Sequence, residues 1–237
     1  PFIVLFFFSM VRGEDYDTWF HLGVGRWILA HLRVPSLDPF SFTAANHAYI
    51  DSHWIFQVTS SLLYSAGGIR ILILFQSCAF LAAYFLLYRS AAAPRFKLLL
   101  SFCLLTAAVN VSQRMLLRPD IFTFLFIGIF WFLLYGKKGA LDLSDISILV
   151  LCQIVWVNAH GLYPLGVGFV GCRVLGALSS RWMPLPFEWK ASEDQSTPTG
   201  RLLLLSGLIL AACLVTPYGW NALKYSYLLY TEIGSSA

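Results

Sequence analysis

Acidic side chains and an imidazole follow the first apolar run of the chain, in the segment EDYDTWFHL. They are Glu14, Asp15, Asp17 and His21. Because Asp17 and His21 are four residues apart, a helix over 17–33 would present both on one face. A carboxylate there can act as a general base, and together with Asp15 it can bind a divalent metal. The structural alternative is that Asp17 is the N-cap of a helix lying at a membrane interface.

Two arginines precede Pro119, which opens a later apolar run. Arg114 and Arg118 are four residues apart, so both can point to the same side. Guanidinium groups match the oxygens of a phosphate, and the pair therefore predicts an anion site. The structural alternative is that Arg118 pairs with Asp120 or binds lipid headgroups.

Two further pairs of polar residues lie at the ends of apolar runs. Asp51 and His53 open a helix expected over 51–66, with Asp51 as its N-cap. Asn158 and His160 lie in the turn WVNAHGLYPLG. Such side chains can bind sugar or phosphate oxygens, or they can satisfy backbone groups of the turn itself.

The composition requires a largely apolar environment. Hydrophobic residues make up 58% of the 237 residues and charged residues only 12%, against about 25% charged residues in soluble domains. A soluble fold of this size could not bury so much apolar surface, so lipid must surround most of the chain. The net charge of +4 comes without a run of Lys and Arg, which argues against a nucleic-acid partner.

The apolar runs and their connections predict an all-α fold, a polytopic transmembrane helical bundle of about seven spans. Lys and Arg gather in alternate connections, and the positive-inside rule places these connections in the cytoplasm. The first span would be a truncated one within 1–11. The others are expected at 70–88, 96–112, 119–135, 143–157, 161–178 and 202–218.

Residues 1–237 would then form one transmembrane domain, which we expect to be truncated at both ends. Residues 12–68 form an outer loop with two interfacial helices, and six spans follow within 69–219. Residues 179–201 form a cytoplasmic connector, and 220–237 an outer interfacial tail. With this topology the acidic, imidazole and guanidinium groups described above all fall on the outer side. Ionisable groups near membrane depth point to a functional site.

The segment EDYDTWFHL resembles the first outer loop of the GT-C glycosyltransferases. These integral-membrane enzymes use polyprenyl-phosphate-linked sugars and include oligosaccharyltransferases and protein mannosyltransferases. Members of the family place two juxtamembrane helices in this loop, in agreement with the topology inferred from charge. The likeness to bacterial GT-C-like proteins covers most of the chain and includes Arg118-Pro119, Asn158–Gly161 and Pro217–Gly219.

The resemblance implies a role for each of these residues. Asp17 would be the catalytic carboxylate, and Asp15 would support it or help to hold a divalent metal such as Mg²⁺ or Mn²⁺. Arg114 and Arg118 would bind the donor phosphate. The residues that would bind substrate oxygens are His21, Asp51, His53, Asn158 and His160.

The leading hypothesis is a glycosyltransferase of the bacterial inner membrane with its site on the periplasmic side. It would transfer a sugar from a polyprenyl-phosphate donor to an acceptor, in contact with membrane lipid. One alternative is a non-catalytic GT-C-like subunit packed in a larger membrane protein complex. Another is a lipid-handling protein or transporter, which the shortage of charges in the middle of the spans disfavours.

Overall fold

The computed structural model describes residues 2–10, 16–43, 47–90, 94–111, 116–182 and 197–235. Within these ranges the chain is helical apart from turns and loops, and it contains no β-strand, so the all-α prediction is confirmed. Asp15 and Arg114 lie outside the described residues, as does most of the predicted connector 179–201.

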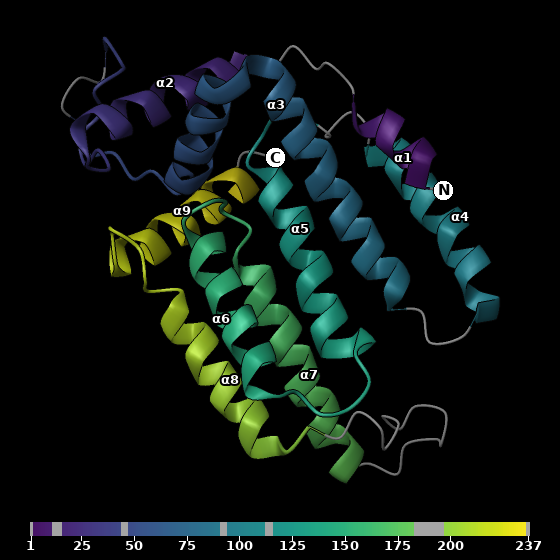
Figure 1. Ribbon diagram of the computed structural model, residues 1–237. Coiled ribbons are helices and arrows are strands. Elements are labelled where there is room, and N and C mark those ends of the chain that lie inside the picture. The colour runs from purple at the N-terminus through teal and green to yellow at the C-terminus, as the bar shows by residue number, and fades with distance from the viewer. Residues whose placement is uncertain are drawn as a thin grey trace.

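Nine α-helices and one π-helical turn make up the described part of the chain (Figure 1). In chain order they are α1 (Phe2–Ser9), α2 (Tyr16–His31), α3 (Trp54–Arg89), α4 (Pro94–Val111), α5 (Asp120–Trp131), the π-helical turn η2 (Phe132–Gly136), α6 (Leu143–Val157), α7 (Pro164–Trp182), α8 (Thr199–Ala212) and α9 (Trp220–Ser235).

The long helix α3 consists of two straight helices joined at a sharp bend. Gly67 and Gly68 leave the helical conformation, and Gly68 adopts φ +64° and ψ −156°, which a side chain would disfavour. The first half of α3 packs along α2, whereas the second half packs along α5 (Figure 1). The bend therefore falls between the interfacial helix expected over 51–66 and the membrane span expected over 70–88.

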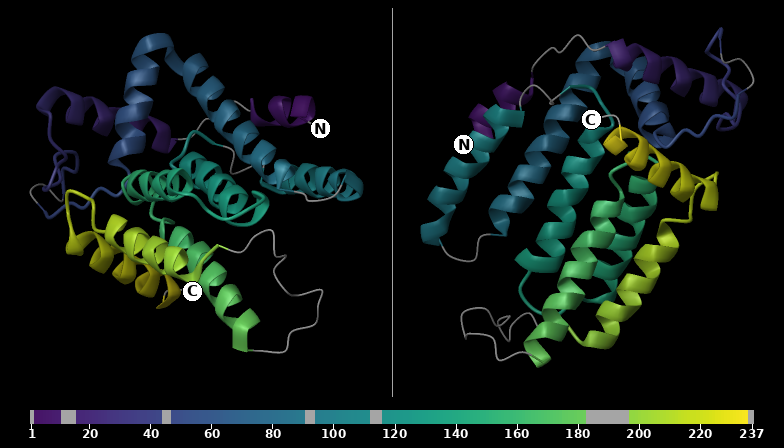
Figure 2. Two further views of the ribbon diagram at one scale, coloured as in Figure 1. Left: turned by 60° about the horizontal axis from the view of Figure 1, so that its bottom comes forward. Right: turned by 180° about the vertical axis from the view of Figure 1, so that it is seen from behind.

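Beyond the bend, successive helices run up and down beside one another (Figure 2). The helices α3, α5 and α7 end at the lower end of Figure 1, where α4, α6 and α8 begin. The start of α5 and the turns after α6 and α8 lie at the upper end. Across this upper end lie α2, the first half of α3 and α9, so chain segments far apart in sequence meet there.

Two apolar clusters hold the helices together. One joins α5, α6, α7 and α8 around Phe130 and Trp156, whose side chains are fully buried. The other joins α2, α3, α4 and the start of α5 around Leu22, Phe80 and Ile121. Burial of such side chains is the main stabilising contribution to a fold of this kind, and here it fixes the positions of the helix ends.

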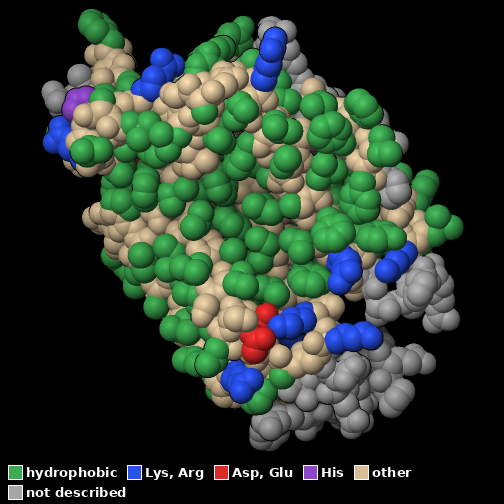
Figure 3. Space-filling view, in the orientation of Figure 1, with side chains coloured by type: hydrophobic (Ala, Val, Ile, Leu, Met, Phe, Trp, Pro, Cys, Tyr) green, Lys and Arg blue, Asp and Glu red, His purple; other side chains and the backbone are tan. Residues whose placement is uncertain are grey.

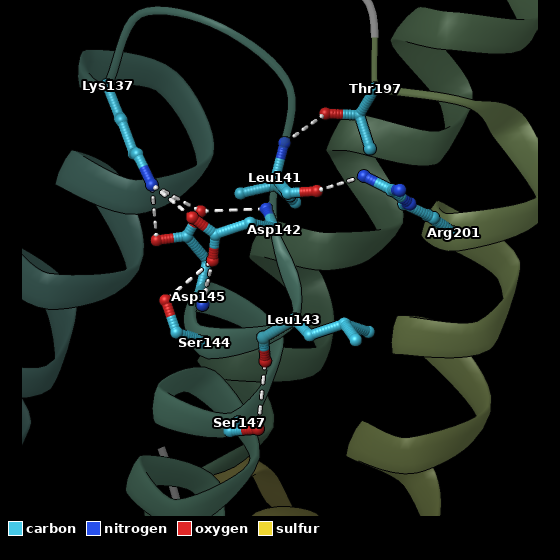
Figure 4. A network of polar contacts seen from close by, with 9 residues as sticks. All are labelled: Lys137, Leu141, Asp142, Leu143, Ser144, Asp145, Ser147, Thr197 and Arg201. Atoms are coloured by element: carbon cyan, nitrogen blue, oxygen red, sulfur yellow. Dashed lines mark hydrogen bonds and ion pairs between the residues drawn. The ribbon is translucent and has the colours of Figure 1, made fainter.

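The lower end of the bundle is closed by a network of polar contacts at the start of α6 (Figure 4). Asp142 and Asp145 form a reciprocal capping box, in which each carboxylate accepts the backbone N–H of the other residue. Nζ of Lys137 lies 2.6 Å from Oδ2 of Asp145. Arg201 of α8 donates to the carbonyl oxygen of Leu141 at 2.9 Å. These contacts connect the end of η2, the start of α6 and the start of α8.

The structure changes several of the expected helix limits. Judged by length and composition, α3 is the one described helix that could cross a membrane, and α6 and α8 are apolar but shorter. The helix expected over 202–218 ends at Ala212, because residues 213–219 form turns with Gly219 at φ +51°. The tail expected at 220–237 contains helix α9. The structure therefore establishes an all-α bundle with one helix, among those described, that is long and apolar enough to cross a membrane.

Candidate functional site

Asp17 lies in the first turn of α2 and contacts Arg118 just before α5. Oδ2 of Asp17 is 3.2 Å from Nη2 of Arg118, and 60% and 40% of their side chains are exposed. Thr18 donates from Oγ1 to the carbonyl oxygen of Leu117 at 3.3 Å, which fixes the start of α2 against this segment. The N-cap role considered for Asp17 is wrong, because α2 already begins at Tyr16.

Asp120, at the start of α5, contacts His160, and among the described residues no ion pair joins it to Arg118. Its Oδ1 lies 3.4 Å from Nε2 of His160. On the other side of the ring, Nδ1 of His160 lies 2.7 Å from Oγ1 of Thr123, and this oxygen accepts the indole N–H of Trp156 at 2.9 Å. Since the Thr123 oxygen already accepts from Trp156, its own hydrogen is available to Nδ1. We infer that His160 carries its proton on Nε2, which faces the carboxylate of Asp120.

Three imidazole rings form a row at this end of the bundle. The ring centroids of His21 and His53 are 5.9 Å apart, and those of His53 and His160 are 5.8 Å apart. The pKa of His53 is lowered to about 3, mainly by burial and to a smaller extent by the neighbouring His160 and His21. Burial also lowers the pKa of His160, although the Asp120 carboxylate opposes this change. His53 and His160 are therefore neutral at physiological pH.

Asp51 is buried beside this row, with only 2% of its surface exposed. Its Oδ1 accepts the backbone N–H of His53 at 2.9 Å and the side-chain amide of Gln57 at 3.2 Å, whereas Oδ2 is buried and has no hydrogen-bond partner within the described part of the chain. Burial raises the pKa of Asp51 to about 6, and the two hydrogen bonds only partly offset it. The predicted N-cap role of Asp51 is wrong, because the cap position of α3 is occupied by His53.

Gln57 connects Asp51 to the imidazole row and was not identified from the sequence. Its Nε2 donates to Oδ1 of Asp51 at 3.2 Å and lies 3.3 Å from Nδ1 of His21. Both amide hydrogens are used in this way, which makes Nδ1 of His21 an acceptor. Oε1 of Gln57 is buried without a partner among the described residues. A polar residue inside the apolar stretch 54–66 was the available signal.

Asn158 ties three elements together at the same end of the bundle. Its Nδ2 donates to the carbonyl oxygens of Ile154 at 2.8 Å and Val215 at 2.7 Å. Its Oδ1 accepts the indole N–H of Trp54 at 2.8 Å, and its backbone oxygen accepts from Ile55 at 3.0 Å. Because both amide hydrogens are used, Asn158 has no donor left for a substrate. The geometry favours the structural alternative that the sequence left open for this residue.

Tyr218, in the turn before α9, binds Asp51 and the loop that precedes α3. Its phenol oxygen accepts the backbone N–H of Asp51 at 3.0 Å and donates to the carbonyl oxygen of Pro35 at 2.8 Å. Burial raises the pKa of Tyr218 to about 12, so the phenol stays protonated. The structure thus adds Gln57, Thr123 and Trp156 to the contacts at this end, and it gives a partner to Tyr218, which lies within the Pro217–Gly219 segment singled out from the sequence.

The described residues hold no group of three or more His, Cys, Asp or Glu arranged to bind a metal. The predicted partner of Asp17 in such a site, Asp15, lies outside the described residues. Comparison of the chain with protein-family models, with curated proteins and with solved structures found no match in any of the three.

The arrangement has two parts with different chemical capacities. The Asp17–Arg118 pair is partly exposed and offers one proton acceptor and one group that binds anions. The cluster of His21, Asp51 and His53 is more buried, and burial disfavours the charged forms of Asp51 and His53. The first part can act on a ligand, whereas the second part positions the helix ends.

Proposed function

We propose that the chain is an integral-membrane, GT-C-like glycosyltransferase of the bacterial inner membrane. It transfers a sugar from a polyprenyl-phosphate donor to an acceptor at the periplasmic face. The observation that carries this proposal is the contact of the Asp17 carboxylate with the Arg118 guanidinium, 3.2 Å apart, at the partly exposed end of an otherwise apolar bundle.

The outer surface of the bundle supports a membrane environment. On the face shown in Figure 3, hydrophobic side chains cover the middle, and Lys and Arg lie toward its upper and lower edges. Leu98 and Phe102 of α4 are 81% and 68% exposed, and Leu151 of α6 is 62% exposed. Contiguous apolar surface of this kind is unfavourable in water and favourable in lipid. Short apolar helices such as α6 and α8 can be accommodated by local thinning of the bilayer.

The distribution of basic side chains supports an orientation of the bundle in the membrane. Lys137 and Arg201 lie in the polar network at the lower end of the bundle. The positive-inside rule assigns this end to the cytoplasm. The Asp17–Arg118 pair at the opposite end then faces the periplasm, where the sugar of a flipped polyprenyl-phosphate donor is presented.

The Asp17–Arg118 pair can supply both functions that the transfer needs. A donor phosphate that binds Arg118 competes for the guanidinium and releases the Asp17 carboxylate to act as a base. The acceptor hydroxyl then gives its proton to Asp17, and its oxygen bonds to the anomeric carbon of the sugar. The bond from that carbon to the phosphate oxygen breaks. The electron pair leaves on the polyprenyl phosphate, and Arg118 offsets the added negative charge.

The described residues do not form a metal site, and no step of this scheme passes through a metal. The buried cluster has a supporting role. His160 and Asp120 hold the start of α5, and Thr18 holds the start of α2, so the two elements that carry Arg118 and Asp17 are fixed relative to one another. Fixed positions of this kind are what general base catalysis requires.

The test is a host strain in which the gene is replaced by the Asp17→Asn variant. We expect polyprenyl-phosphate sugar to accumulate in lipid extracts measured by mass spectrometry, with transfer slowed about 10²- to 10⁴-fold. Asp38→Asn is the matched control. Asp38 lies in the loop between α2 and α3, and its Oδ1 accepts two backbone N–H groups that the amide oxygen of Asn would still accept.

The same experiment separates the enzyme from the non-catalytic subunit. The resting structure also suits a scaffold, because the Asp17 carboxylate already has an ionic partner. If a deletion strain accumulates donor but the Asp17→Asn strain does not, the protein acts through its presence in a complex. If neither strain accumulates a donor lipid, the glycosyltransferase proposal is wrong.

A further inference from the structure

A groove of about 370 Å³ lies between the loop that precedes α3 and the first turns of α9. The loop wall is held in shape by a hydrogen bond from the Tyr49 N–H to the Ser36 carbonyl at 2.9 Å and by the bridge between Leu37 and Ala48. Its polar lining consists of Ser36, Tyr49, Tyr218, Asn221, Lys224 and Tyr225.

The groove contains polar side chains without partners. Among the described residues, the structure gives no side-chain hydrogen bond to Tyr49, Asn221, Lys224 or Tyr225. A phenol, an amide and an ammonium group therefore converge on one space with their hydrogen-bonding capacity unused. The phenol rings add flat apolar faces beside them.

The charges around the groove argue against an anionic ligand. Lys224 is the one charged side chain among the described residues that line it. The pKa of Tyr49 is raised by burial first and then by the negative charges of Asp51 and Asp38. Negative potential at Tyr49 opposes the positive charge of Lys224, so the groove offers little net attraction to a phosphate or carboxylate.

The polar lining also argues against a hydrocarbon chain. A lipid tail in the groove would exclude water from Tyr49, Asn221 and Tyr225 without replacing its hydrogen bonds, and that desolvation is costly. A ligand with both hydroxyl groups and an apolar face satisfies the phenols, the amide and the ammonium group together. Pyranose sugars have this combination, since their C–H groups form an apolar face and their hydroxyls lie around the rim.

The groove is connected to the candidate site through Tyr218. This residue lines the groove, and its phenol oxygen also accepts the backbone N–H of Asp51 at 3.0 Å. A ligand in the groove therefore lies against the residue that fixes Asp51, at the same end of the bundle as Asp17 and Arg118.

We propose that this groove is an acceptor subsite that binds a neutral pyranose. The ring stacks on the phenol of Tyr225, while Asn221 and Lys224 bind its hydroxyl groups. The inference rests on the proposed glycosyltransferase function and adds the chemical class of the acceptor to it.

The experiment probes an array of immobilised neutral and charged oligosaccharides with the full chain purified in non-ionic detergent. We expect binding to neutral glycans, and a loss of affinity of about tenfold or more in Tyr225→Ala. Tyr227→Ala is the matched control, because Tyr227 lies on α9 with 69% of its surface exposed and does not line the groove. Tyr49→Phe removes a single hydroxyl without changing the ring and should also weaken binding.

Three results would overturn the inference: no neutral glycan is bound, charged glycans are preferred, or Tyr225→Ala and Tyr227→Ala lose affinity equally.

The Asp17→Asn variant distinguishes failure of the acceptor subsite from failure of the proposed glycosyltransferase function. It should bind the same glycans as the wild type and transfer sugar to them about 10²- to 10⁴-fold more slowly. If the groove variants bind normally while Asp17→Asn is inactive, the subsite is wrong and the glycosyltransferase proposal stands. If groove variants lose binding while Asp17→Asn still transfers, the catalytic proposal is the one that fails.

Discussion

Replacing Asp51 by Asn should change the way in which stability depends on pH. Burial raises the pKa of Asp51 from 3.8 to about 6, so between these values the folded chain holds a proton that the unfolded chain has released. The folded state therefore gains stability as the pH falls through this window. At pH 7 the buried carboxylate is ionised in both states, and its cost to the folded state is about 3 kcal/mol.

His53 should act in the opposite direction. Its pKa falls from 6.5 to about 3 on folding, so below pH 6.5 the unfolded chain takes up a proton that the folded chain does not. The folded state then loses stability as the pH falls, by at most about 1.4 kcal/mol per pH unit. Because 34% of the His53 side chain is exposed, solvent screening should make the measured loss smaller. In the wild type the contributions of Asp51 and His53 oppose one another between about pH 6 and 4.

The assay is thermal unfolding in non-ionic detergent, followed by intrinsic fluorescence from pH 4 to pH 8 and compared with the wild type at each pH. Asp51→Asn keeps the oxygen that accepts from His53 and Gln57, so it should be more stable than the wild type above pH 6.5 and lose this advantage toward pH 4. His53→Asn should gain stability relative to the wild type as the pH falls. Asp38→Asn should show neither trend above pH 4, because hydrogen bonds lower the pKa of Asp38. A constant difference between Asp51→Asn and the wild type would refute the reasoning.

Other contacts give predictions that do not depend on pH. Asn158→Ala should lower the free energy of unfolding in detergent by about 2 kcal/mol, because it removes hydrogen bonds to part-buried partners such as the Trp54 indole N–H; a loss below about 0.5 kcal/mol would contradict the structural role that we assign to Asn158. Gly68→Ala should cost about 1 kcal/mol because of its φ of +64°, whereas Gly23→Ala, in open space within α2, should not destabilise. Thr123→Val should alter the ¹⁵N chemical shifts of the His160 ring, since it removes the donor to Nδ1; unchanged shifts would contradict the inferred tautomer.

The helices and the bend of α3 could be predicted because their signals are local. Apolar runs mark the helices, and the pair Gly67-Gly68 marks the bend, since glycine is the residue that tolerates a positive φ. The end of α8 was missed because Cys213 to Val215 are apolar and continue the run although the backbone already turns. Hydropathy reports the environment of a segment and not its backbone conformation.

The pairing of the site residues could be predicted only in part. Periodicity places Asp17 and His21 on one face of a helix, but it contains no information about which residue faces them across the bundle. Arg118 had Asp120 as a close neighbour in sequence, yet its partner in space is Asp17. The contact between the Thr18 hydroxyl and the Leu117 carbonyl joins residues 99 positions apart and decides this outcome, because it brings α2 to the segment before α5.

The buried cluster sets the electrostatic background for an anion that binds at this end of the bundle. His53 and His160 are neutral because burial lowers their pKa values, and Asp51 has a pKa near 6 for the same reason. His53 and His160 therefore add no positive charge that could attract a phosphate, and the Asp51 carboxylate, ionised at pH 7, adds a negative charge that repels it. An anion that reaches this end must then be attracted by Arg118, whose side chain is 40% exposed and therefore partly screened by solvent. Replacing the ionised Asp51 by neutral Asn should consequently strengthen phosphate binding at Arg118, whereas an added negative charge in the cluster should weaken it.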